Sequence, residues 1–177
     1  MKKGGKGGKN TKTGAIFEEK RDLAKFLSAI PGYKIDKDDV YYNSEKIARI
    51  FKKHGLYKFL DEKSINWKEI ISRQLLPDDG IYVLVKNTLF IIECKFQNKP
   101  GSVDEKLQTC DFKKKQYQKL FKPANIDIQY FYILSNWFKQ SKYKDVLEYI
   151  NSVGCHYCFE IPLIEFGLPD PRPHTKD

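Results

Sequence analysis

The stretch from Ile81 to Phe96 constrains the fold of this chain more than any other part of it. Two runs rich in β-branched and aromatic residues, Ile81–Val85 and Thr88–Phe96, are separated by Lys86-Asn87, a pair that suits a tight turn. The pattern therefore predicts a β-hairpin, with strands of the length that globular proteins ordinarily use.

An amphipathic helix is expected on each side of this hairpin. Before it, apolar residues recur at three- and four-residue steps from Gly14 to Ile30, and Pro31-Gly32 ends the pattern. After it, Ser102 opens a helix with Glu105 in the spacing of a capping box, and Pro123 ends that helix. The apolar face of the second helix consists of Val103, Leu107, Cys110, Tyr117 and Phe121. Its lysines lie largely outside that face: Lys113, Lys114, Lys115 and Lys119.

The rest of the chain adds shorter elements. Between Asn43 and Gln74 the pattern favours helices, one from Ser44 to His54 and one around Trp67–Arg73. Beyond the second helix the sequence predicts a strand, a helix and a last strand, at Ile126–Leu134, Tyr143–Asn151 and Cys155–Leu163. This order of elements predicts an α/β fold, a single domain with a central mixed β-sheet flanked by helices.

The charge of the chain points to a polyanionic partner. Its 32 basic and 23 acidic residues give a net charge of +9, which favours binding to nucleic acid. Residues Met1–Thr13 are rich in lysine and glycine and contain no acid, a composition typical of a flexible arm. Such an arm is either a solvated tail or a segment that binds phosphates. We therefore divide the chain into this arm and a folded domain, residues 14–177.

Neither a membrane location nor export is expected. No apolar run approaches the roughly 18 residues of a membrane span. The lysines and glycines at the amino terminus are not followed by the apolar segment of a secretory signal. These features predict a protein that acts in the cytoplasm.

The pair Cys155 and Cys158, with His156 between them, has two interpretations. A zinc site would need four ligands, so Cys110 and a further histidine would have to complete it. The apolar and aromatic surroundings instead favour cysteines that are buried in a strand.

The strand Thr88–Phe96 carries opposite charges where a core strand would stay apolar. On one of its faces Leu89 and Ile91 are followed by Glu93 and Lys95, whereas Phe90, Ile92, Cys94 and Phe96 on the other face are apolar or nearly so. Burying such charges is costly unless they are paired or bound to something. The two residues therefore either form an ion pair on an exposed edge strand or belong to a binding site.

The geometry of a hairpin brings a third charged residue to this pair. A two-residue turn at Lys86-Asn87 places Asp78 opposite Lys95, and opposing residues share a face. Asp78 then lies within about 7–8 Å of Glu93 on the diagonal. Asp79 faces the other way, and a one-residue slip of the turn would exchange the two aspartates.

Two carboxylates and a lysine in this arrangement suit the hydrolysis of a phosphodiester. Asp78 and Glu93 offer the hard oxygen ligands that Mg²⁺ prefers, and the backbone carbonyl of Cys94 offers another. Mn²⁺ is expected to substitute for Mg²⁺. The metal lowers the pKa of its waters, and the ammonium group of Lys95 stabilises an attacking hydroxide or the charge that develops on the phosphate.

At these residues the sequence resembles the PD-(D/E)XK nuclease superfamily. Pro77-Asp78 supplies the first half of its motif and Glu93-Cys94-Lys95 the second. The surrounding sequence is similar to small type II restriction endonucleases. The resemblance implies a magnesium-dependent enzyme that cleaves double-stranded DNA as a homodimer. The order of elements from Gly14 to Leu134 matches the family core, provided that a third strand lies before or beside the hairpin.

Two further site residues depend on this resemblance. The family often adds an acidic residue from its first helix, which implies Glu18, although Glu19 lies closer to the apolar stripe of that helix and remains the alternative. Gln97 continues the strand face of Glu93 and Lys95. It either orients the water or a phosphate, or is an exposed glutamine at the edge of the sheet.

Two other functions fit the same features. One is a structure-selective DNA nuclease, of the junction-resolvase or repair type, which shares the fold and the charge. The other is a non-catalytic DNA-binding module on a nuclease scaffold. The complete set of Asp78, Glu93 and Lys95 argues against the second, because loss of activity usually leaves such a set incomplete.

Overall fold

The computed structural model of the chain describes residues 22–99 and 101–172. The arm Met1–Thr13 and both candidate acids of the first helix, Glu18 and Glu19, lie outside the described residues. Within the described part, no helix is long and apolar enough to cross a membrane.

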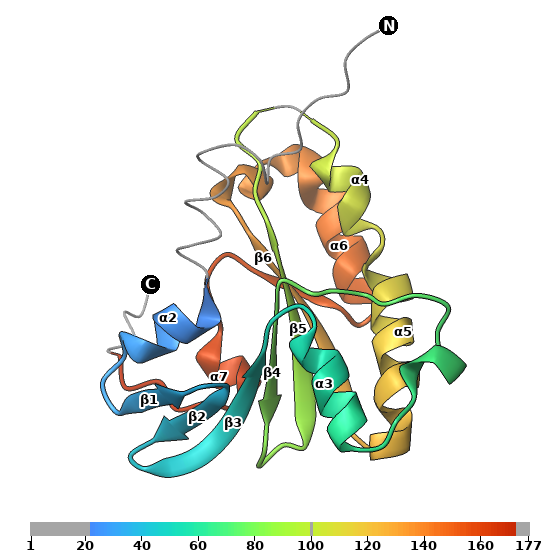
Figure 1. Cartoon of the computed structure of the whole chain (residues 1–177). Helices are drawn as coiled ribbons and strands as arrows, with labels where there is room; N and C mark the ends of the chain where they lie inside the picture. The colour runs from blue at the N-terminus through green and yellow to red at the C-terminus, as the bar shows by residue number, and fades with distance from the viewer. Residues whose placement is uncertain (1–21, 100, 173–177) are drawn as a thin grey trace, which may run out of the picture.

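A mixed sheet of seven strands, which neighbour one another in chain order, forms the centre of the domain (Figure 1). The first five strands pair antiparallel, whereas β5, β6 and β7 pair in parallel. The strands are β1 (Tyr33–Asp36), β2 (Asp39–Tyr42), β3 (Glu45–Phe51), β4 (Asp79–Val83), β5 (Thr88–Lys95), β6 (Asp127–Leu134) and β7 (His156–Cys158). The predicted fold class, a single α/β domain with a mixed sheet, is confirmed.

Helices cover both faces of this sheet (Figure 1). One face carries α3 (Gly55–Glu62), α4 (Val103–Leu107), α5 (Cys110–Phe121) and α6 (Lys144–Ser152), and the other carries α2 (Leu23–Ser28) and α7 (Leu163–Phe166). Short 3₁₀ helices connect some elements, at Trp67–Glu69, Lys122–Ala124, Asn136–Lys139 and Ser141–Tyr143. Because both faces are covered, β5 is buried along almost its whole length, with a continuous apolar run from Leu89 to Ile92.

Most predicted elements are present in the structure. The hairpin, the strand at Ile126–Leu134 and the helix at Tyr143–Asn151 are confirmed, and the described end of the first helix precedes Pro31-Gly32. The helix predicted from Ser102 is divided into α4 and α5, and the Ser102 side chain makes no capping hydrogen bond. The last predicted strand is shorter than expected, because β7 ends at Cys158 and Leu163 begins α7.

The helix predicted for Ser44–His54 is wrong, because this segment forms strand β3. Ser44 was expected to cap a helix, but with Asn43 it adopts a left-handed conformation, at φ 72° and 47°, in the turn that joins β2 to β3. Gly55 begins α3 and does not end a helix. The helix expected at Trp67–Arg73 is a single 3₁₀ turn. Strand β3 is the third strand that the family core requires.

The cysteines are distributed over the core on both sides of the sheet. Cys110 and Cys155 are buried in the core that α5 and α6 share, whereas Cys158 is half-buried on the other side. Within the described residues, no three His, Cys, Asp or Glu side chains are grouped so that they could hold a metal ion.

Candidate active site

The register of the hairpin differs from the predicted one by two residues. Val83 pairs with Thr88, so the turn spans the four residues 84–87 instead of two. Asn87 closes this turn, since its backbone is left-handed at φ 48° and its N–H donates to the carbonyl of Leu84 at 3.1 Å. A shift of two residues leaves every side chain on its original face. Continuing the pairing places Asp78 opposite Glu93 and not, as predicted, opposite Lys95.

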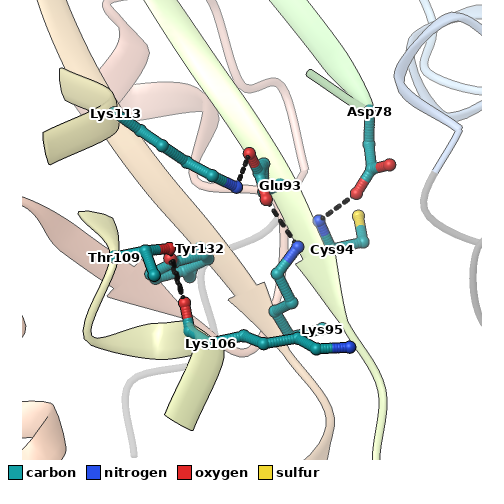
Figure 2. Close-up of polar contacts among 8 residues, drawn as sticks. All are labelled: Asp78, Glu93, Cys94, Lys95, Lys106, Thr109, Lys113 and Tyr132. Carbon is teal, nitrogen blue, oxygen red and sulfur yellow. Dashed lines mark hydrogen bonds and ion pairs between the residues drawn. The ribbon is translucent and has the colours of Figure 1, made fainter. Parts of the chain in front are cut away.

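Asp78 lies where the pairing of β4 with β5 ends. The last pair joins Asp79 to Ile92, and Pro77 has no N–H with which to extend the ladder. The Asp78 carboxylate instead accepts a hydrogen bond of 3.0 Å from the backbone N–H of Cys94 (Figure 2). Since the N–H and C=O of one residue in a strand point to the same edge, the carbonyl of Cys94 also points toward Asp78.

Glu93 is a buried carboxylate held between two lysines. It is only 6% exposed, and its two oxygens accept from Lys95 Nζ at 2.5 Å and from Lys113 Nζ at 2.6 Å (Figure 2). Burial alone would raise the pKa of Glu93, but the charges and hydrogen bonds of the two lysines outweigh it and lower the pKa to about 2. Glu93 is therefore ionised across the whole physiological pH range.

Lys113 enters this site from α5. The sequence predicts Lys113 largely outside the buried face of that helix, and for this residue the prediction is wrong. It lies three residues after Cys110 and four before Tyr117, both of which are buried. The sequence did hold a signal for this role, because Lys113 lies on the apolar stripe of its helix. An unpaired ammonium group is costly to bury, so a lysine in such a position indicates a buried acidic partner.

Two tyrosines of β6 line the same site. Tyr130 and Tyr132 are fully buried, and their rings meet edge to face at 5.4 Å. Burial, and then the negative charge of Glu93, raises the pKa of both hydroxyls. Lys95 lies over the ring of Tyr132 at 5.6 Å. The tyrosines stay neutral and provide Glu93 and Lys95 with low-dielectric surroundings, in which electrostatic interactions are stronger than in water.

The structure contradicts one of the two sequence-based interpretations of Gln97, whereas its role toward a water or a phosphate stays a prediction. It is buried, so it is not an exposed glutamine at the sheet edge. Its side-chain amide donates to the carbonyls of Lys99 and Gly101 at 3.0 and 3.3 Å, and its backbone N–H donates to Ser135 Oγ. Gln97 therefore fastens the loop between β5 and α4, and through it the end of the strand that carries Lys95.

Asp79 faces away from this site into the opposite core. It is 6% exposed, it accepts a hydrogen bond from the backbone of Leu23, and its Oδ1 has no partner among the described residues. Burial raises its pKa to about 7, despite the nearby charge of Lys52. Lys52 itself bonds to Asp22 at 2.6 Å. Asp79 is thus a carboxyl group that is partly protonated at neutral pH.

A divalent metal suits the donors at the end of β5. Asp78 and the ionised Glu93 offer two carboxylates, and the carbonyl of Cys94 is directed to the same place. Mg²⁺ is typically bound by one or two carboxylates and keeps several waters, so it does not require a larger protein cage. Each carboxylate oxygen has two lone pairs, so the lysine contacts of Glu93 leave capacity for a metal.

Comparison with known proteins finds a similarity to a nuclease family over part of the chain. Residues 40–120 match a family model described as PD-(D/E)XK nuclease superfamily domain. This stretch runs from β2 into α5 and contains Asp78, Glu93, Lys95 and Lys113. No curated protein and no solved structure matches the chain. The resemblance stated from the sequence is confirmed over residues 40–120, which are similar to a nuclease superfamily whose members generally use divalent metals.

Proposed function

We propose that the chain is a magnesium-dependent type II restriction endonuclease that cleaves a short specific sequence of double-stranded DNA in the cytoplasm. The observation that carries the proposal is the meeting of Asp78, the ionised Glu93 and Lys95 at one end of β5. A homodimer is expected, because cutting both strands of a palindromic site requires two such centres.

Each residue of the centre has a distinct task in this mechanism. Asp78 and Glu93, with the carbonyl of Cys94, would hold the metal, with Mn²⁺ as a substitute for Mg²⁺. The bound metal supplies positive charge that polarises a phosphoryl oxygen and lowers the pKa of a water. Lys95 stabilises the negative charge that develops on the phosphate during in-line attack. Lys113 holds Glu93 in position through its second oxygen.

Digestion of a plasmid with Mg²⁺, followed by sequencing of the fragment ends, tests this function. We expect discrete fragments whose ends share one short sequence. Cleavage confined to branched DNA would contradict the restriction activity and support a structure-selective nuclease. Binding without cleavage of any DNA form, with Mg²⁺ or Mn²⁺, would support a non-catalytic module instead.

Deleting residues 1–12 is expected to weaken the salt dependence of DNA binding. If the lysines of the arm bind phosphates, the slope of log K against log [salt] becomes shallower by about one unit for each phosphate that the arm no longer neutralises. The measurement is a titration of fluorescent duplex DNA at several salt concentrations. An unchanged slope would show that the arm is only a solvated tail.

A further inference from the structure

A second charged feature lies outside the centre described above. A pocket of about 410 Å³ opens at the end of β3, between the β1–β2 turn and the start of α3. We call it the β3-end pocket. Four lysines line it: Lys37, Lys52, Lys53 and Lys58.

The charge of this pocket is only partly neutralised from within the described part of the chain. Lys52 is paired with Asp22, and Asp38 also lines the pocket. The other three lysines form no ion pair with any described carboxylate. Several like charges around one cavity repel one another, so an anion that binds there lowers the free energy of the site.

The topology places this pocket at the same end of the sheet as the candidate active site. Phe51, the last residue of β3, pairs with Gly80, and the charge of the next residue, Lys52, reaches the Asp79 carboxyl beside Asp78. In Figure 1, β3 ends and α3 begins near the start of β4. From β3 to β5 the distance across the sheet is two strand spacings, about 10 Å. This distance equals about three base-pair steps of B-DNA. One duplex lying over the end of the sheet therefore reaches both the β3-end pocket and the candidate active site.

A larger basic surface elsewhere does not share this location. Lys119 and Lys122 lie on it with Thr88 and Asp127, which begin β5 and β6. Because β5 and β6 run in parallel, these residues lie at the opposite end of β5 from Lys95. The seven steps along the strand correspond to about 23 Å. This surface is therefore remote from the centre and provides a natural control.

We propose that the β3-end pocket binds a backbone phosphate of the DNA substrate close to the position that is cut. The proposal rests on the proposed function, since it assumes a DNA substrate. Lysine ammonium groups are point charges that bind phosphate without reading bases. The pocket thus fixes the strand relative to Asp78, Glu93 and Lys95, and it contributes affinity but no sequence preference.

The test compares two double variants of equal charge. Lys53→Met/Lys58→Met alters the pocket, and Lys119→Met/Lys122→Met alters the remote surface. All four lysines are exposed, so both variants should fold, which thermal melting checks. Both are made in a Lys95→Met background so that the DNA stays intact, and binding to a duplex is measured from low to moderate salt.

The pocket variant should bind about tenfold more weakly at low salt, with a slope shallower by about one unit, equally for duplexes with and without the cleavage site. The control should keep the parental slope. Equal changes in both variants, or no change in the pocket variant, would overturn the proposal while leaving the nuclease function intact. Failure of the parent protein to bind DNA at all would overturn both.

Discussion

Replacing Lys95 with methionine is expected to lower the rate of DNA cleavage by about 10²–10³-fold, the usual loss when one group that stabilises transition-state charge is removed. Methionine preserves much of the length of the side chain and its packing against Tyr132. Glu93 keeps Lys113 as its partner at 2.6 Å, so neither the fold nor the position of the carboxylate should change. Single-turnover cleavage of a plasmid measures the rate.

Two matched variants distinguish a role of Lys95 on the phosphate from a role in holding Glu93. Lys119→Met removes an equal charge from the remote end of α5 and should leave the rate unchanged. Lys113→Met removes the other partner of Glu93 and should cost at most about tenfold, because Lys95 still holds that carboxylate. If Lys113→Met and Lys95→Met were equally damaging, Lys95 would act only by holding Glu93, and its assigned role on the phosphate would be wrong.

Replacing Asp79 with asparagine is expected to stabilise the folded protein at pH 8 by up to about 4 kcal/mol. Burial raises the pKa of Asp79 from 3.8 to about 7, and this difference corresponds to that free energy. Between pH 3.8 and about pH 7 the folded state binds more protons at Asp79 than the unfolded state does. The contribution of Asp79 to stability therefore falls as the pH rises from about 4 to 7 and is constant above that.

Urea denaturation at pH 4.5 and pH 8 measures this effect. The Asp79→Asn protein should gain stability over the parent at pH 8 and differ little from it at pH 4.5, because the introduced amide is neutral at both pH values. Asp61→Asn, at an exposed position on α3, is the control and should change neither value. A loss of stability of Asp79→Asn at pH 8 would mean that the charged form of Asp79 is the one the fold requires.

The two strands of the hairpin could be predicted because their residues fit no helical pattern. Strand β3 could not be predicted in this way. Ile47, Ile50 and Phe51 are spaced three and four residues apart, which fits one face of a helix. In the structure Ile50 and Phe51 instead point into the two different cores on opposite faces of the sheet. Only the pairing with β4 distinguishes these alternatives, and that pairing is a tertiary contact.

The sequence predicted that Asp78, Glu93 and Lys95 lie together, but not which of them pair across β4 and β5. Asp78, Glu93 and Lys95 lie at the same end of the hairpin because the error in register was two residues, an even number. The length of the turn depends on the left-handed backbone of Asn87, whose side chain also accepts from the Tyr82 hydroxyl. The role of Lys113 required the packing of α5 against the sheet, which no local pattern specifies.

The metal dependence of plasmid cleavage tests the central claim most directly. Supercoiled plasmid is incubated with the full chain in Mg²⁺, in Mn²⁺ or in excess chelator, beside the Asp78→Asn variant in Mg²⁺. We expect cleavage by the parent protein with either metal, and none with chelator or with the variant. Cleavage that persists in chelator, or that Asp78→Asn retains in full, would contradict a metal-dependent centre built on Asp78 and Glu93.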